Sequence, residues 1–221
     1  MQPTRTLTAH CTLSHPADGQ PLLTIDNEHA KAEISLFGAH VLRYQRHGEP
    51  ASLWLSDKAV LDGSKPIRGG IPLCWPWFGP APARVGSGKP AHGFARTSLW
   101  TLDGVSDHGD GTLVHLSLRD TDASRALWPH AFELELDVLV GKELSLVLTT
   151  RNTGKTPLTY NAALHTYLQI SAPEAVSVTG LGEPYADKLT GQDGQQQGAL
   201  TLSAAMDRIY RQAEAMVMVK D

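Results

Sequence analysis

The residues AFELELDVLV, from Ala131 to Val140, decide the fold. Apolar and acidic side chains alternate along them with a period of two, which is typical of a β-strand that buries one face and exposes the other. The positions expected to face inward are Phe132, Leu134, Leu136 and Val138. Gly-Lys-Glu at 141–143 leads into a second such segment at 143–151. The two segments therefore predict a β-hairpin.

Similar strands are predicted on the N-terminal side of this hairpin, separated by turns that contain Gly or Asp. They lie at 30–36, 40–46, 53–55, 98–105 and 112–119. The one helical candidate runs from Thr121 to Leu127 and ends before Pro129. Strands at hairpin spacing without long helices between them predict an all-β fold, a large antiparallel β-sandwich. Without an evident linker or repeat, residues 1–221 are expected to form a single domain.

Composition limits the classes of function. Apolar residues make up 41% of the chain, which is enough for a sizeable core, and the net charge is −4. Without a basic cluster, nucleic acid and anionic membranes are not expected partners. The N-terminal residues lack the apolar core of a signal peptide, and Cys11 and Cys74 read as reduced thiols, so a cytoplasmic protein is expected.

A long irregular segment runs from Pro66 to Arg96, PIRGGIPLCWPWFGPAPARVGSGKPAHGFAR. Its many prolines and glycines exclude a regular helix or central strand through most of it. Its apolar side chains are expected to bury enough surface to fix the loop; they are Ile71, Leu73, Trp75, Trp77 and Phe78. The basic side chains then remain to reach a ligand. Loops of this length are usually functional or disordered, and the apolar anchors favour function.

Residues 164–170 form a second candidate region. Their alternation places Leu164 and Leu168 on a face expected to pack into the core, and His165, Tyr167 and Gln169 on the other. An imidazole, a phenol and an amide in one row suit a bound sugar, although spacing alone also fits an ordinary surface His beside a Tyr. The sequence has no metal-ligand spacing, Walker motif, GxGxxG or Gly-x-Ser-x-Gly elbow, so we expect no cofactor and no metal.

Five stretches together resemble one family: PIRGGIPLCWPWFG, HGFAR at 92–96, WPHAFEL at 128–134, LHTYL at 164–168 and DRIY at 207–210. They are similar to the hexose-6-phosphate mutarotases, or glucose-6-phosphate 1-epimerases, of the aldose 1-epimerase superfamily. The resemblance implies a galactose-mutarotase-like supersandwich. It also implies interconversion of the α and β anomers of an aldohexose 6-phosphate, and we expect a monomer that binds this small-molecule sugar phosphate.

The resemblance also assigns roles to residues. His165 matches the general acid, which suits imidazole because it gains and loses a proton near neutral pH. Arg68 and Arg96 match the residues that hold the phosphate, and His92 matches a histidine that contacts the sugar. Asp207 matches a carboxylate that binds sugar hydroxyls; on the residues alone it also reads as a turn residue that opens a strand.

Two departures from the family pattern affect these expectations. Ala91 stands where some relatives carry a Gln that contacts the ligand. The family's general base is a glutamate beyond the DRIY motif, after a Trp-Asn-Pro segment, and this sequence has neither. We therefore expect the last strands of the family fold to be missing and the 221-residue chain to turn over little substrate.

Two other functions remain open. A non-catalytic sugar-phosphate-binding protein would keep the pocket and lack the base. An aldose 1-epimerase acting on unphosphorylated sugars would not need Arg68 and Arg96. The preferred hexose and the oligomeric state are not determined by the sequence.

Overall fold

The predicted hairpin lies within a four-stranded antiparallel sheet of order β10-β9-β8-β7. Its strands are β9 (Phe132–Gly141), β10 (Leu144–Asn152), β8 (Gly111–Arg119) and β7 (Thr101–His108). Leu144 pairs with Val140 across the turn, and all four residues expected to face inward from β9 are buried. The alternation in this segment therefore gave the correct strand and the correct face.

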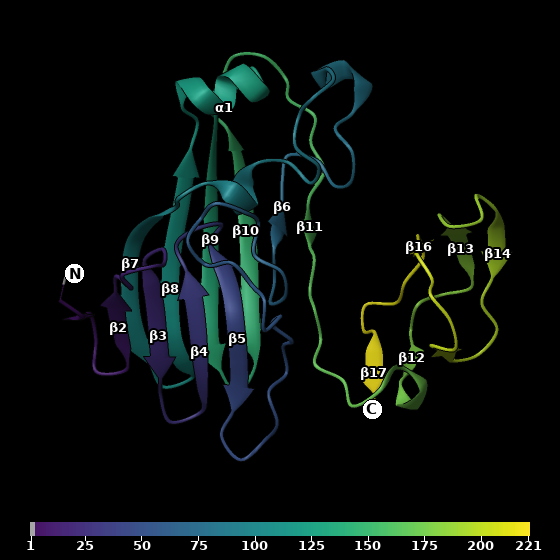
Figure 1. Cartoon of the computed structure of the whole chain (residues 1–221), viewed down its shortest axis with the longest axis horizontal. Coiled ribbons are helices and arrows are strands. Elements are labelled where there is room, and N and C mark those ends of the chain that lie inside the picture. The colour runs from purple at the N-terminus through teal and green to yellow at the C-terminus, as the bar shows by residue number, and fades with distance from the viewer. Residues whose placement is uncertain (1–2) are drawn as a thin grey trace. The chain divides into compact units, whose positions relative to one another are not determined.

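A second antiparallel sheet holds the first five strands in chain order. They are β1 (Arg5–Thr6), β2 (Cys11–Ser14), β3 (Leu22–Asp26), β4 (Ala30–Ser35) and β5 (His40–Arg46). Figure 1 shows this sheet in front of the β7–β10 sheet. Apolar side chains of both sheets form one core, among them Ile25, Ile34, Leu116 and Leu136, so the predicted antiparallel sandwich is confirmed.

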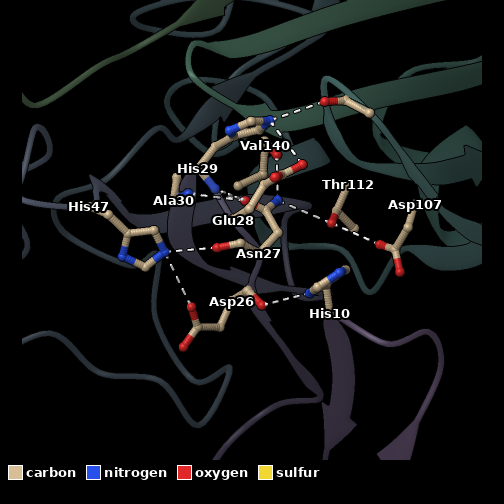
Figure 2. Close-up of polar contacts among 11 residues, drawn as sticks. His10, Asp26, Asn27, Glu28, His29, Ala30, His47, Asp107, Thr112 and Val140 are labelled. Atoms are coloured by element: carbon tan, nitrogen blue, oxygen red, sulfur yellow. Dashed lines mark hydrogen bonds and ion pairs between the residues drawn. The ribbon is translucent and has the colours of Figure 1, made fainter.

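Asn27, in the turn between β3 and β4, ties the two sheets together (Figure 2). Its side-chain amide donates to the Val140 carbonyl oxygen at 2.8 Å and to Thr112 Oγ1 at 3.1 Å, both in the opposite sheet. Its Oδ1 accepts from the backbone N–H groups of His29 and Ala30, at 2.9 and 3.0 Å. A buried amide is tolerated here because its donors and acceptor are all used.

The helical prediction is also confirmed. Helix α1 spans Asp122–Leu127, and Thr121 caps it in a reciprocal pair with Ser124. Three short 3-10 turns complete the helical structure described: η1 (Ala83–Val85), η2 (Ala95–Thr97) and η3 (Pro173–Ala175). None of the helices described is long and apolar enough to cross a lipid bilayer.

The long segment from 66 to 96 forms one short strand, β6 (Leu73–Cys74), which pairs with β11 (Ala163–Leu164). Trp75 is fully buried and lies 4.6 Å from the Phe132 ring, centroid to centroid, at the start of β9. Aromatic packing therefore fixes the loop on the sandwich, as expected. Phe78 departs from the prediction, because it is 39% exposed and its ring lies beside His92 instead of in the core.

This computed structural model describes residues 3–221, which form two units that divide after Leu168. The second unit begins at Gln169 and holds two three-stranded antiparallel sheets. One is β15 (Leu200–Thr201), β12 (Ser177–Thr179) and β17 (Met218–Lys220). The other is β14 (Asp193–Gln195), β13 (Pro184–Asp187) and β16 (Arg208–Tyr210).

A single domain over 1–221 stays a prediction, and Met1 and Gln2, which it includes, lie outside the described residues. The predicted strand at 53–55 is wrong: Leu53 and Leu55 make only isolated bridges, to Leu168 and Gly69. The backbone there pairs with loop segments, so no continuous ladder forms.

Candidate active site

Four of the five predicted site residues line one cavity of about 280 Å³ in the first unit: Arg68, His92, Arg96 and His165. The other residues that line it are Pro66, Ile67, Pro72, Cys74 and Tyr167. The long loop supplies most of this lining, and the segment after β11 supplies His165 and Tyr167. Residues up to 101 positions apart in the sequence, Pro66 and Tyr167, therefore meet at one pocket.

Gly69 and Gly70 hold Arg68 at this pocket. Both have positive φ, 110° and 61°. A Cβ on Gly69 would lie 2.6 Å from the Trp54 carbonyl oxygen, and one on Gly70 would lie 2.3 Å from that of Val41. Only glycine fits so close to the neighbouring backbone. The two glycines therefore let the loop lie against the β5 backbone, next to the arginine.

His40, on β5, bonds to the same turn through its imidazole ring. It is 1% exposed, and its Nε2 lies 2.7 Å from the Gly69 carbonyl oxygen. Since a carbonyl can only accept, Nε2 carries the proton and donates it. Burial lowers the pKa of His40 to about 4, so the imidazole is neutral at physiological pH. His40 is not among the residues predicted for the site, because its contact with Gly69 is formed only by the fold.

The HGFAR segment is fixed by main-chain bonds to Trp75. Phe94 and Ala95 donate their N–H groups to the Trp75 carbonyl oxygen, at 3.0 and 3.2 Å. A Cβ on Gly93, where φ is 70°, would lie 2.0 Å from that same oxygen. His92 also has a positive φ, 65°, and its backbone N–H donates to Gly79 at 2.7 Å. His92 and Arg96 are therefore held at the pocket by backbone anchored to a core tryptophan.

The two arginines give the pocket an uncompensated positive charge. Among residues 3–221, neither Arg68 nor Arg96 forms an ion pair with a carboxylate, and no described acidic residue lines the cavity. Arg96 donates from Nη2 to the Ala91 carbonyl oxygen at 3.0 Å, while its Nε is buried without a described partner. A buried guanidinium N–H without an acceptor is costly unless a ligand supplies one.

His165 lies among three aromatic rings. Its centroid is 5.0 Å from that of Tyr167, 5.7 Å from Phe78 and 6.1 Å from His92. The predicted shared side for His165 and Tyr167 is thus confirmed by their common cavity. Their backbone N–H groups donate to Pro72 and Gly70, at 3.0 and 2.9 Å, so the segment runs along the PIRGG loop.

The opposite side of this segment departs from the prediction. Leu164 and Leu168 are 41% and 46% exposed, so they do not pack into the core. Regular strand pairing ends at Leu164, and the backbone beyond it bonds to the loop instead of joining a sandwich layer. Gln169, expected in the same row as His165, belongs to the second unit.

Asp207, the fifth predicted residue, also belongs to the second unit, and its role at the pocket stays a prediction. Its Oδ2 accepts from Lys188 Nζ at 2.8 Å, and it directly precedes β16. Cys74 also lines the cavity, although the sequence predicted only a reduced thiol there and no role at the site. Burial raises the pKa of its thiol, which keeps the sulfur protonated and uncharged.

The sequence comparisons agree with these motifs. The chain matches the family described as aldose 1-epimerase over residues 21–220. An Escherichia coli K12 protein named "Putative glucose-6-phosphate 1-epimerase" is 35% identical over 206 residues, which are 92% of this chain and 68% of that protein. A Cenchrus ciliaris protein of the same name is 33% identical over 202 residues, 86% of this chain and 60% of its own length.

Solved structures support the same fold. A Salmonella typhimurium protein described as a "putative mutarotase" superposes with a TM-score of 0.92 at 33% identity, covering 99% of this chain and 72% of its own. A Synechocystis sp. PCC 6803 protein gives a TM-score of 0.84 at 23% identity, covering 94% and 75%. The resemblance inferred from the motifs is thus confirmed, and the chain belongs to the aldose 1-epimerase family of isomerases.

Proposed function

We propose that this protein interconverts the α and β anomers of an aldohexose 6-phosphate. The observation that carries the proposal is the pocket itself, which joins His165 and His92 to two guanidinium groups without described carboxylate partners. The family supports a sugar as the small-molecule substrate. The E. coli and Cenchrus ciliaris relatives carry names that specify glucose 6-phosphate.

Arg68 and Arg96 are assigned to the phosphate. A phosphate dianion would compensate both charges and supply acceptors to the spare N–H groups, including the buried Arg96 Nε. Guanidinium groups suit this task because their planar fork matches paired phosphate oxygens. A neutral hexose would leave both charges unpaired, so these arginines favour a phosphorylated sugar over a free one.

His165 is assigned as the general acid. It would give its proton to the ring oxygen as the bond from C1 to that oxygen breaks, while a base removes the proton from the anomeric hydroxyl. The resulting open-chain aldehyde rotates about the bond between C1 and C2. Reclosure runs the two proton transfers in reverse and yields the other anomer. His92, at the same pocket, is assigned to the sugar hydroxyls.

A second candidate function follows from the general base, for which the pocket offers no described carboxylate. No carboxylate lines the cavity among the residues described, which favours a protein that binds sugar phosphates without turning them over. The two candidates share the phosphate contacts and differ in catalysis alone.

Anomer exchange separates the two candidates. Magnetisation-transfer NMR on glucose 6-phosphate, corrected for the spontaneous rate, measures exchange between the anomers at equilibrium. Catalysed exchange of glucose 6-phosphate, slow because no described carboxylate lines the pocket and with glucose exchanged more slowly still, is the expected outcome. Saturable binding of glucose 6-phosphate without faster exchange would support the binding protein. Equal rates for both sugars would contradict the phosphate assignment.

A further inference from the structure

A second hollow of about 390 Å³ lies in the first unit and shares no lining residue with the candidate active site. It is formed by three segments: the tip of the long loop at 84–89, the end of α1 with the residues after it, and residues 157–159. Its walls are partly apolar, with Leu127, Trp128 and Pro129 among them. It is the larger of the two cavities.

Cationic side chains from two of these segments converge on the hollow. Arg84 and Lys89 come from the long loop, and Arg125 comes from α1. His130 adds an imidazole, whose ring centroid lies 4.3 Å from that of Trp128. None of the described residues that line the hollow is acidic. Cations grouped around a concave surface raise the local positive potential and concentrate anions there.

The charges of these side chains are compensated to different degrees. Arg125 is paired with Asp120 and with Asp122, the latter at 2.6 Å, so these carboxylates largely neutralise its charge. Lys89 donates one of its three protons to the Ala126 carbonyl oxygen at 2.8 Å, at the last turn of α1. Arg84 reaches only the Thr159 carbonyl oxygen, at 3.4 Å.

The hydrogen bond from Lys89 to the Ala126 carbonyl oxygen supports the C-terminus of α1. This structural role does not account for the other donors of Lys89 or for those of Arg84. Within the described part of the chain, Arg84 and Lys89 have no carboxylate partner, and both keep donors to spare. An oxyanion with several acceptor oxygens would satisfy donors from both side chains at once. The apolar walls leave room for the organic part of a phosphate ester.

We propose that this hollow is a second oxyanion site, which binds the phosphate group of a small organic phosphate or free phosphate through Arg84 and Lys89. The proposal is independent of the function assigned to the first pocket, because no residue is common to the two. Each charged contact is expected to be worth roughly ten- to a hundredfold in affinity.

Isothermal titration of the 221-residue protein with inorganic phosphate and with glucose 6-phosphate, at low ionic strength, tests the proposal. The unmodified protein should show two classes of phosphate site. The double variant Arg84→Ala/Lys89→Ala should lose one class and keep the other. Arg68→Ala/Arg96→Ala should do the reverse, which separates this site from the first pocket. If this site binds glucose 6-phosphate more tightly than inorganic phosphate, its ligand is an organic phosphate. Equal affinities for the two identify the free ion.

The control is Lys142→Ala/Lys155→Ala, which removes the same net charge from two exposed lysines outside either cavity. Arg84→Glu, at an exposed side chain, provides a second variant if the double variant unfolds. A single class of site in the unmodified protein would overturn the proposal. So would an equal loss of affinity in the lysine control, because the effect would then come from net charge alone.

Discussion

Two regions of the first unit are rich in histidine, and they use it differently. Around Asn27, the rings of His10, His29 and His47 each lie within hydrogen-bonding distance of a backbone carbonyl oxygen of another segment, at 3.2, 3.2 and 2.8 Å (Figure 2). At the candidate active site, His165 packs against aromatic rings and lines a cavity with two unpaired arginines.

The difference lies in what surrounds each imidazole. Asp26 and Glu28 lie 3.5 and 3.6 Å from the rings of His47 and His29, so any charge in the Asn27 region is compensated within the protein. The candidate site has arginines and no described carboxylate. An uncompensated charge beside a cavity is therefore a better marker of function here than the number of histidines.

The largest effect should come from His165→Asn. Loss of a general acid should lower the rate of anomer exchange at least a hundredfold, because ring opening then lacks its proton donor. The fold should be retained, since the side chain is only partly buried. Magnetisation-transfer NMR gives the rate, and circular dichroism gives the fold.

The matched control is His47→Asn in the Asn27 region, which should leave the rate within about twofold, as expected for a residue with no acid–base role. A His165 variant that keeps more than about a tenth of the activity would remove that residue from the mechanism.

His40 sharpens the comparison, because it lies beside the site yet resembles the Asn27 histidines in bonding to a carbonyl. Its pKa is about 4 when folded and 6.5 as a free side chain, so the unfolded chain binds a proton that the folded one excludes. The contribution of His40 to the free energy of unfolding is therefore fully present above pH 6.5. It is lost as the pH falls toward 4, by roughly 3 kcal/mol.

His40→Gln checks this contribution, since a glutamine amide can donate to Gly69 without titrating. Urea unfolding at several pH values between 7 and 4 should show a shallower loss for the variant than for the unmodified protein. Parallel curves for the two proteins would show that His40 does not contribute to the pH dependence.

The smallest of the three effects is expected for Arg68→Ala and Arg96→Ala. Each should weaken binding of glucose 6-phosphate by roughly ten- to a hundredfold, because one charge-assisted contact is lost. Binding of glucose should change little. Calorimetric titration of each variant with both sugars is the measurement.

Arg151→Ala is the control for these variants, since that arginine is paired with Glu135 at 3.0 Å on the surface of the β9–β10 hairpin. It should leave the affinity for glucose 6-phosphate unchanged. A matching loss for both sugars in the Arg68 and Arg96 variants would show that these residues do not recognise phosphate.

The sequence predicted those parts of the fold that depend on local pattern. Alternation around Leu134 and Leu136 identified a strand and its buried face, because side-chain direction in a strand follows from position alone. The same rule failed at Leu164 and Leu168. Alternation defines two faces, but which face is covered depends on segments distant in the chain.

The candidate site was predicted from motifs and not from pattern. The resemblance of PIRGG, HGFAR and LHTYL to one family grouped Arg68, Arg96 and His165, and the structure brings these residues to one cavity. The supporting contact of His40 with Gly69 was not predictable, because it joins residues 29 positions apart through a backbone oxygen. Only the folded β5 strand places that imidazole against the Gly69 carbonyl oxygen.

The hydrogen bond between His92 and Gly79 has a consequence for how this protein could be altered. It closes residues 80–91 into a loop whose two ends lie together, 2.7 Å from donor to acceptor. Doubling the length of a closed flexible loop costs only about 0.6 kcal/mol in chain entropy. Inserted residues would extend outward from this closure, while His92 and Arg96 stay anchored through Trp75. The exposed residues 86–88, at the tip of this loop between Arg84 and Lys89, are therefore a natural place to graft a peptide or a second recognition element.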